Sequence, residues 1–271
     1  MTANQAQRER WNDEGFARSW PKRERFTTAI TPALLEAAAL RPGERVLEIG
    51  SGGGLAAIAA ARAVAPGGDV TGFDLSAPLT KMASARAAEA GLANARFVSG
   101  DAQVDELPAG PFDVAISQFG VMFFEDPVAA FGNVRWRLRA GGRLAFACWQ
   151  PAAANTWFPG SVVAPFQPPV PTMNLGDGPA PGPFAFGDEG RVRDILSAAG
   201  FVGIGRQARA INATVPLDSL IDREMVKGLG VPPELEEKAM AAVEAHYATM
   251  RTAAGELAAT LSIQLFTASN P

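Results

Sequence analysis

Apolar and polar positions along the first 150 residues follow two alternating patterns. Five short runs are mostly apolar on both alternating faces, and they cover residues 45–49, 69–73, 95–99, 112–117 and 143–149. Longer stretches rich in Ala, Leu and charged residues separate these runs, at residues 31–40, 54–64, 76–90 and 126–139. Strands that are apolar on both faces are typical of a parallel sheet with helices on both sides. The pattern therefore predicts a doubly wound α/β core.

Three junctions between these elements repeat one order of residues. The sequences AAALRPGERVLEIG, ARAVAPGGDVTGFD and RWRLRAGGRLAFACW each pass from a helical pattern through Gly or Pro-Gly into an apolar run. Glycine after a helix can take the left-handed conformation that caps the last carbonyl groups. Helix, tight turn and buried strand in repeated order indicate a Rossmann-like arrangement.

The second half of the chain differs in composition. Residues 151–187 hold nine prolines and five glycines among 37 residues, together with five aromatic side chains. A loop of this length either covers a functional site or is disordered, and the aromatic residues favour cover. Residues 188–200 then predict a helix and residues 201–215 a strand. Residues 232–260 predict a further helix with an apolar stripe, and residues 261–268 a final strand.

Composition and charge exclude several functions. The net charge of −4 and the pI near 5.2 argue against broad binding to nucleic acid, which needs clustered Lys and Arg. The arginines of the segments RERW (residues 8–11) and KRER (residues 22–25) are interpreted as part of a solvated face. A single cysteine, Cys148, excludes an internal disulfide and any CxxC site, and core packing is predicted for it.

Two features of the sequence bear on the location of the protein in the cell. Its N-terminus lacks the apolar segment of a secretory signal. The longest uncharged stretch, residues 144–176, is broken by prolines and is no simple membrane helix. A cytoplasmic protein without membrane insertion and without a nucleic-acid partner is predicted.

The sequence VLEIGSGGG, residues 46–54, places four glycines within five positions directly after a predicted strand. Glycine permits a tight turn, and it lets the backbone approach a ligand that a Cβ would repel. The predicted helix that follows presents free N–H groups and a dipole that favour a negatively charged ligand group. The loop is therefore predicted to cradle a ligand.

The spacing of the glycines distinguishes two classes of ligand. The dinucleotide pattern GxGxxG is met only in its relaxed form, with Gly52, Gly54 and Ala57. The pattern acid-x-Gly-x-Gly-x-Gly is filled completely, by Glu48, Gly50, Gly52 and Gly54. In this the chain resembles the class I S-adenosylmethionine-dependent methyltransferases. It is most similar to the ubiquinone/menaquinone-methyltransferase-like (methyltransferase type 11) group.

The resemblance covers about residues 40–150 and implies S-adenosylmethionine as cofactor, with a seven-stranded sheet whose last strand is antiparallel. Asp74 ends the second predicted strand, where a carboxylate can accept hydrogen bonds from both ribose hydroxyls. In the family, the residue at Leu75 packs on the adenine, and Asp101 with the Ala102 amide forms the adenine site. Taken alone, each aspartate is more typical of a turn or helix cap. The implied cofactor-binding residues are Glu48, Gly50, Ser51, Gly52, Gly54, Asp74, Leu75, Asp101, Ala102, Gln103 and Gln118.

Methyl transfer needs few catalytic side chains, because the methyl group of S-adenosylmethionine is bound to a sulfonium, which is already an activated leaving group. A general base is needed only for a protonated acceptor. His246, the only histidine, is a candidate base, although it also fits a half-exposed helix position. Gln118 would orient the acceptor. A single histidine excludes a His-rich metal site, and no carboxylate cluster has ligand spacing, so no metal is predicted.

The methyl acceptor is predicted to bind in the irregular parts of the chain. Phe16 and Trp20 lie one helical turn apart, in a segment that closes over the cofactor in similar enzymes. The alternative is simple docking of the first helix on the core. Together with Phe119, Trp149 and Tyr247 they would form an apolar site. A medium-sized, largely apolar metabolite is the inferred acceptor, with oxygen favoured over carbon or nitrogen as the methylated atom.

A single methyltransferase domain is predicted over residues 1–271. Its parts would be an N-terminal lid segment (1–30), a cofactor-binding core (31–150), a Pro/Gly/aromatic insertion (151–187) and a C-terminal part (188–271) with a helical lid (216–257). Two alternatives stay open. An NAD(P)-dependent oxidoreductase would use the relaxed glycine pattern, although Tyr247 is followed by Arg251 where the short-chain form needs Lys. A non-catalytic adenosylmethionine-binding protein would share the same loop.

Overall fold

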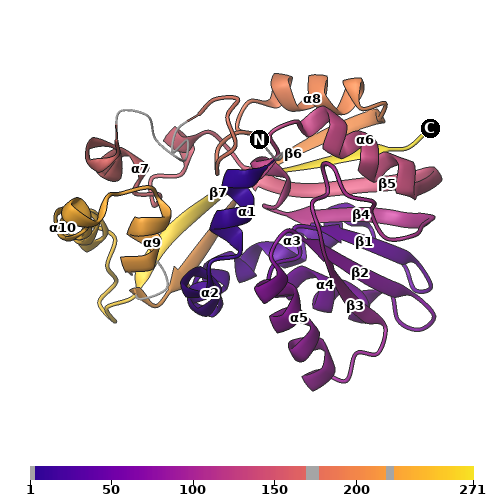
Figure 1. Cartoon of the computed structure of the whole chain (residues 1–271), viewed down its shortest axis with the longest axis horizontal. Coiled ribbons are helices and arrows are strands. Elements are labelled where there is room, and N and C mark those ends of the chain that lie inside the picture. Colours follow the sequence, from indigo (N-terminus) through magenta and orange to yellow (C-terminus); the bar gives the residue numbers. More distant parts are fainter. Residues whose placement is uncertain (1–3, 169–176, 218–222) are drawn as a thin grey trace.

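A computed structural model of the chain describes residues 4–168, 177–217 and 223–271 (Figure 1). A seven-stranded sheet runs through them in the order β3-β2-β1-β4-β5-β7-β6. Its strands are β1 (Arg45–Ile49), β2 (Asp69–Asp74), β3 (Ala95–Ser99), β4 (Phe112–Gln118), β5 (Leu138–Trp149), β6 (Val202–Val215) and β7 (Leu257–Ser269). Strands β1 to β5 are parallel, and β7 is antiparallel to β5 and β6. The predicted doubly wound sheet with an antiparallel last strand is confirmed.

Helices cover both faces of the sheet, as the apolar pattern of the strands requires. On one side lie α3 (Thr31–Ala38), α4 (Leu55–Ala63) and α5 (Ala77–Glu89), and on the other α6 (Pro127–Arg137) and α8 (Glu189–Ala198) (Figure 1). Val46 and Leu47 are neighbours on β1 and point to opposite faces, yet both are fully buried. A strand in this position must be apolar at successive residues.

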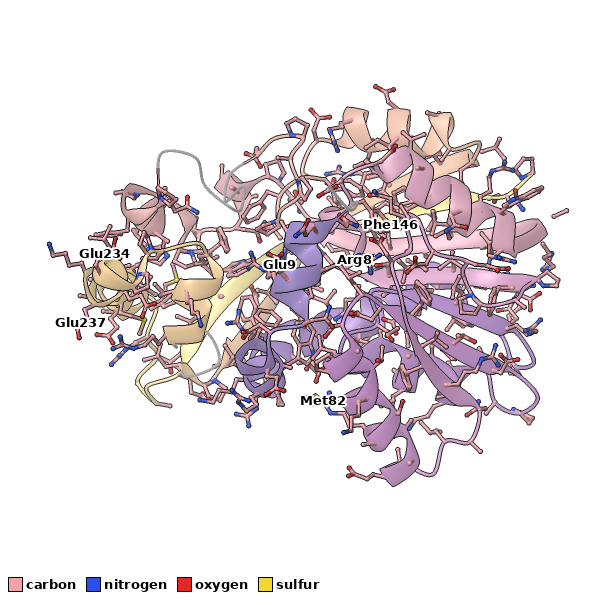
Figure 2. The ribbon with its side chains drawn as sticks, in the orientation of Figure 1. Arg8, Glu9, Met82, Phe146, Glu234 and Glu237 are labelled. Atoms are coloured by element: carbon pink, nitrogen blue, oxygen red, sulfur yellow. The ribbon has the colours of Figure 1, made fainter. Side chains whose placement is uncertain are left out.

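A second group of helices gathers beside the sheet. We call α1 (Gln5–Trp11), α2 (Glu14–Thr27), α7 (Gly160–Val163), α9 (Arg223–Gly228) and α10 (Glu236–Ala248) the cover helices. The long strands β6 and β7 extend from the core toward α9 and α10 (Figure 1). Phe146 lies in the sheet, whereas Glu234 and Glu237 lie at the far outer side of the cover helices (Figure 2). The two groups meet over the edge of the sheet where the parallel strands end.

Local sequence sets where several helices begin. Asp13, Ser76, Asp126 and Asp188 precede α2, α5, α6 and α8. Each side chain accepts a hydrogen bond from the amide three residues further on, at distances of 2.8, 3.3, 2.9 and 2.8 Å. These caps satisfy N–H groups that a helix leaves free at its first turn.

The helix predicted over residues 232–260 is too long. α10 ends at Ala248, a turn follows in which Gly255 has a φ of +81°, and β7 begins at Leu257. Leu257 pairs with Val215, so the last residues of the predicted helix belong to the ladder between β6 and β7. Hydrogen bonding along a strand ladder outweighs the helix propensity of an Ala-rich segment.

Leu47→Ala is expected to lower the free energy of unfolding by about 3 kcal/mol, because it leaves a cavity at the centre of the sheet. Trp136 on α6 is 82% exposed, so Trp136→Ala should change the free energy by less than about 0.5 kcal/mol. Urea unfolding followed by circular dichroism measures both variants. Equal losses in the two variants would contradict the burial described for β1.

Candidate functional site

A cavity of about 320 Å³ lies at the carboxyl ends of the central strands. Its floor comes from residues that end or follow β1, β2, β3 and β4. Its walls come from α1, α2, Trp149 at the end of β5, residues 157–159, Leu229 after α9 and Tyr247 on α10. Open α/β sheets bind ligands at this edge, where the strand order reverses between β1 and β4. The volume lies in the range of about 300–1,000 Å³ that is usual for small-molecule sites.

Most of the residues predicted from the sequence line this cavity. From the predicted cofactor set they are Glu48, Gly50, Ser51, Gly52, Asp74, Leu75, Asp101, Ala102 and Gln118, and from the predicted acceptor set Phe16, Trp20, Phe119, Trp149 and Tyr247. Three predicted residues, Gly54, Gln103 and His246, are not part of the lining.

These three residues have structural partners instead. A Cβ on Gly54 would lie 2.9 Å from a side chain of α5, so this glycine lets α4 and α5 pack closely. The Gln103 side chain accepts a hydrogen bond from the Asp126 amide at 2.8 Å. His246 is half-buried, and its Nε2 lies 3.0 Å from the carbonyl oxygen of Thr156. Their roles in binding or catalysis stay predictions.

The glycine loop packs against protein on two sides. Gly50 has a φ of +70°, and a Cβ there would lie 2.6 Å from the Cα of Gly120 in the loop after β4. Gly52 has a φ of +51°, and a Cβ there would lie 2.6 Å from the ring of Trp20. The Gly50 amide donates to the Phe73 carbonyl at 2.8 Å, which ties the loop to β2. Because these glycines lack a Cβ, they leave room for neighbouring parts of the chain as well as for a ligand.

Two carboxyl groups lie beside this loop, the buried Glu48 and the half-buried Asp74. Asp74 accepts hydrogen bonds from the amides of Gly52 at 2.7 Å and Ser76 at 2.8 Å. Glu48 is 2% exposed, and its Oε2 has no hydrogen-bond partner among the described residues. Burial, and then the charge of Asp74, raise the pKa of Glu48 well above its usual value. Burial also raises the pKa of Asp74, against the lowering effect of its two amide donors. A cationic ligand group would relieve this cost.

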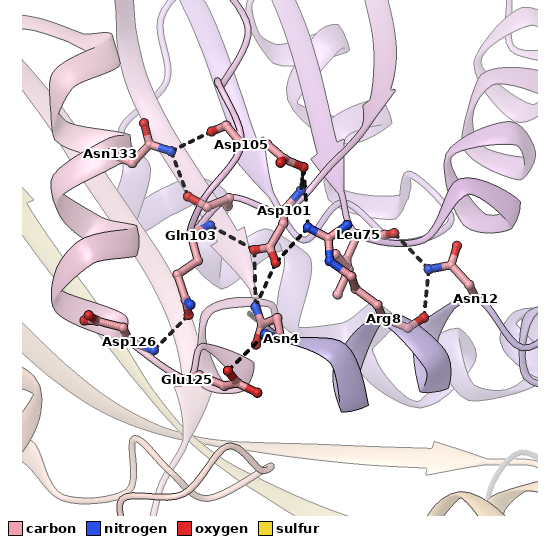
Figure 3. A network of polar contacts seen from close by, with 11 residues as sticks. Asn4, Arg8, Asn12, Leu75, Asp101, Gln103, Asp105, Glu125, Asp126 and Asn133 are labelled. Atoms are coloured by element: carbon pink, nitrogen blue, oxygen red, sulfur yellow. Dashed lines mark hydrogen bonds and ion pairs between the residues drawn. The ribbon is translucent and has the colours of Figure 1, made fainter. Parts of the chain in front are cut away.

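The carboxylate of Asp101 is held by the first cover helix (Figure 3). Its two oxygens each accept from the Asn4 side-chain amide at 3.2 Å, and Arg8 donates to Oδ2 at 3.2 Å. The backbone amide of Gln103 donates to Oδ1 at 3.0 Å. Asn4 is 3% exposed, and its own Oδ1 is buried without a partner among the described residues. Sequence reasoning missed Asn4 and Arg8, because nothing in the polar N-terminus indicates contact with a residue so far along the chain.

Aromatic side chains line another part of the cavity. Phe119 has a φ of +64°, which is rare for a residue with a Cβ and is often found at functional sites. Its ring stacks on Trp149 at 4.1 Å between centroids, and Trp149 contacts Trp157 at 4.9 Å. Gln118 accepts from the Thr31 hydroxyl at 2.9 Å and donates to a carbonyl of α2 at 3.2 Å. The Gln118 amide is thus held in place by α2 and α3.

The arginines predicted to form a solvated face occupy different environments. Arg10 and Arg23 line the cavity, and Arg8 binds Asp101. The prediction is wrong for these three residues, and it is confirmed for the exposed Arg25. Charge alone does not reveal which side of a short helix lies over a cavity, because the packing partners are distant in sequence.

Metal-ligand clusters and membrane-spanning helices are both absent from the described ranges. Within them, no group of three or more His, Cys, Asp or Glu side chains is arranged to hold a metal ion. Cys148 is fully buried in the apolar core, and burial raises the pKa of its thiol. No described helix combines the length and the apolar character needed to cross a membrane.

Comparison with known proteins assigns the family. A family profile described as a methyltransferase domain matches residues 46–142. Nocamycin O-methyltransferase of Saccharothrix syringae is 30% identical over 261 residues, which cover 89% of this chain and 91% of that protein. Aklanonic acid methyltransferase DauC of Streptomyces sp. (strain C5) is 35% identical over 121 residues, 45% of this chain and 55% of that protein.

Solved structures share the fold. A putative methyltransferase from Bacillus halodurans has a TM-score of 0.60 at 19% identity and covers 89% of this chain and 98% of that one. A SAM-dependent methyltransferase from Aquifex aeolicus has a TM-score of 0.57 at 15% identity and covers 96% and 99%.

The chain therefore belongs to the class I S-adenosylmethionine-dependent methyltransferases, with S-adenosylmethionine as its cofactor. This membership leaves the nicotinamide-dependent and non-catalytic alternatives without support. The ubiquinone/menaquinone-like subgroup stays a prediction.

Glu48→Gln is expected to stabilise the ligand-free protein at pH 8. Because the pKa of Glu48 is raised above 4.5, the folded protein keeps a proton that the unfolded chain has lost. The free energy of unfolding therefore falls as the pH rises from 4.5 through the raised pKa, by at most about 1.4 kcal/mol per pH unit. Gln removes this fall, so the gain over the parent protein should be absent at pH 4 and grow with pH.

Urea unfolding at a series of pH values measures the effect, with Glu36→Gln as the matched control. Glu36 is exposed, and Arg209 lowers its pKa, so that variant should keep the decline of the parent protein. A Glu48→Gln curve that runs parallel to the parent curve would show that the buried carboxyl group does not determine this pH dependence.

Proposed function

We propose that this methyltransferase transfers the methyl group to an oxygen atom of a small, largely apolar metabolite. The observation that carries the proposal is the aromatic wall of the cavity, formed by Phe119, Trp149 and Trp157. Apolar walls with few polar groups are typical of sites for small organic ligands. The similarity to nocamycin O-methyltransferase over most of both chains supports oxygen as the acceptor atom.

The buried polar groups of the floor fit the cofactor. When bound, S-adenosylmethionine supplies a methyl group that is already activated on a positively charged sulfur. We infer that Glu48 and the glycine loop hold its amino-acid end, that Asp74 accepts from the ribose hydroxyls and that Leu75 packs on the adenine. The unpaired Oε2 of Glu48 and the raised pKa of both carboxyl groups suit a cationic ligand. The Ser51 hydroxyl, also buried without a partner among the described residues, offers a further hydrogen bond.

For the adenine we propose a site shared between Asp101, Ala102 and Asn4. The oxygens of Asp101 already accept from Asn4, Arg8 and a backbone amide, whereas Oδ1 of Asn4 is buried with no partner in the described part of the chain. Asn4 would accept from the adenine amino group, and Asp101 would hold the Asn4 side chain in place. The Ala102 amide would donate to a ring nitrogen.

We propose that no side chain lining the cavity removes a proton from the methyl acceptor. His246 is outside the lining, so its role as a base has no geometric support here. Tyr247 is in the lining, but burial raises the pKa of its phenol, which stays protonated at neutral pH and so does not serve as a base. An acceptor that arrives ionised needs no base. Gln118, held by α2 and α3, would orient it.

We propose that the parts of the single domain divide these tasks. Residues 31–150, with Asn4, hold the cofactor. Residues 1–30, 151–187 and 216–257 cover the cavity and contact the acceptor, and the remainder of 188–271 completes the sheet. Residues 1–3, 169–176 and 218–222 of these ranges lie outside the described part of the chain.

Asp74→Ala should weaken the binding of S-adenosylhomocysteine about 10- to 100-fold, because charge-assisted hydrogen bonds to the ribose are lost. Asp188→Ala is the matched control, since it removes a carboxylate that caps α8 away from the cavity. Titration calorimetry gives both affinities, and circular dichroism checks that both variants are folded. An unchanged affinity in folded Asp74→Ala would remove the ribose assignment.

Methylation on oxygen is expected when the protein is incubated with S-adenosylmethionine carrying a ¹³C-labelled methyl group and a panel of phenols, hydroxy acids and isoprenoid-like alcohols. Mass spectrometry identifies products that gain the label, and the NMR shift and couplings of the labelled carbon identify the atom to which it is bound. Label found on carbon or nitrogen would contradict the proposed acceptor atom.

A further inference from the structure

We propose that the acceptor is an organic acid and that Arg10 binds its anionic group. This inference rests on the proposed transfer of a methyl group to a small metabolite and adds the chemical class of that metabolite. The anionic group would be a carboxylate or another strongly delocalised oxyanion, and the rest of the molecule would contact the aromatic wall. Arg10 is thereby assigned to acceptor specificity.

The placement of Arg10 on α1 separates it from the residues that bind the core. Arg8 on α1 and the residues that flank the helix, Asn4 and Asn12, contact Asp101 and the carbonyl of Leu75. Arg10 lies two residues from both Arg8 and Asn12, so it projects from a different side of the helix. It lines the cavity on that side.

The charge of Arg10 has no counter-ion among the described residues. Its side chain makes no ion pair or hydrogen bond within the described ranges, and its Nε is buried there without a partner. Its guanidinium rests on the ring of Trp11, 5.5 Å from the centroid. Burial, and then the like charge of Arg23, lower the pKa of Arg10 to about 10, which still leaves it cationic at neutral pH.

The acids of the two N-terminal cover helices are engaged elsewhere. Glu9 accepts from Gln5, and Glu14 pairs with Arg18. Glu24 lines the cavity but accepts from Arg86 and from the indole of Trp20. A half-buried cation beside a second guanidinium is costly unless an anion is supplied, and a ligand can supply it.

The distribution of charge in the cavity favours the acceptor over the cofactor as the source of this anion. The floor carries the carboxyl groups of the buried Glu48 and the half-buried Asp74, and the cover carries Arg10, whereas Arg23 beside it is engaged by Ser19. A cationic cofactor on the floor and an anionic acceptor under the cover match this arrangement. The aromatic rings of Phe16 and Trp11 below the two guanidinium groups add apolar surface for the acceptor.

The experiment compares 2-naphthoate with the uncharged 2-naphthamide as probes of the protein saturated with S-adenosylhomocysteine. Titration calorimetry is expected to show that the parent protein binds naphthoate about 10-fold more tightly than naphthamide, as a charge-assisted contact allows. Arg10→Gln should abolish this preference by weakening the binding of naphthoate alone, and Arg10→Lys should retain part of the preference. Arg18→Gln is the matched control, because Arg18 is an exposed arginine of α2 outside the lining, and it should keep the full preference.

Three results would overturn the inference. The parent protein could bind both probes equally, or folded Arg10→Gln could keep the preference for naphthoate. Arg10→Gln could also weaken the binding of S-adenosylhomocysteine itself by a similar factor, which would show that the guanidinium binds the carboxylate of the cofactor. Failure of the proposed O-methylation is a separate result, seen as label on carbon or nitrogen, and the probe preference does not depend on it.

Discussion

The loops that follow β1 and β4 touch each other because glycine stands on both sides of the contact. A Cβ on Gly50 would lie 2.6 Å from the Cα of Gly120, and a Cβ on Gly120 would lie 2.8 Å from the Cα of Gly50. These are the neighbouring strands at which the sheet order reverses, so the contact fixes the middle of the cavity floor. Phe119, next to Gly120, takes its left-handed conformation here and turns the chain toward the aromatic wall.

Around this contact the protein holds charged groups that the described residues do not fully balance. Glu48 is buried and Asp74 half-buried in the floor, and their raised pKa values reflect the cost of ionisation there. Arg10 lies in the cover without a described counter-ion. Such groups destabilise the ligand-free protein, and they favour ligands of complementary charge. The site is thus prepared for ligands at the expense of stability, a common compromise at active sites.

The cover helices contribute to the site as much as the sheet does. Trp20 packs on the glycine loop, and Asn4 and Arg8 hold Asp101 at the end of β3. Tyr247 comes from the other end of the chain, carried on α10 between the long strands β6 and β7. The complete cavity therefore forms only when segments more than 200 residues apart come together.

The sequence by itself determined the sheet, the glycine loop and most of the floor, because helical and strand periodicity and the short-range acid-glycine spacing are local properties. Tertiary structure decided which side of α1 covers the cavity, and hence the positions of Arg10 and Asn4. It also ended α10 at Ala248, because the residues from Leu257 onward form hydrogen bonds with β6. Contacts between residues distant in the chain depend on packing against surfaces that no local pattern encodes.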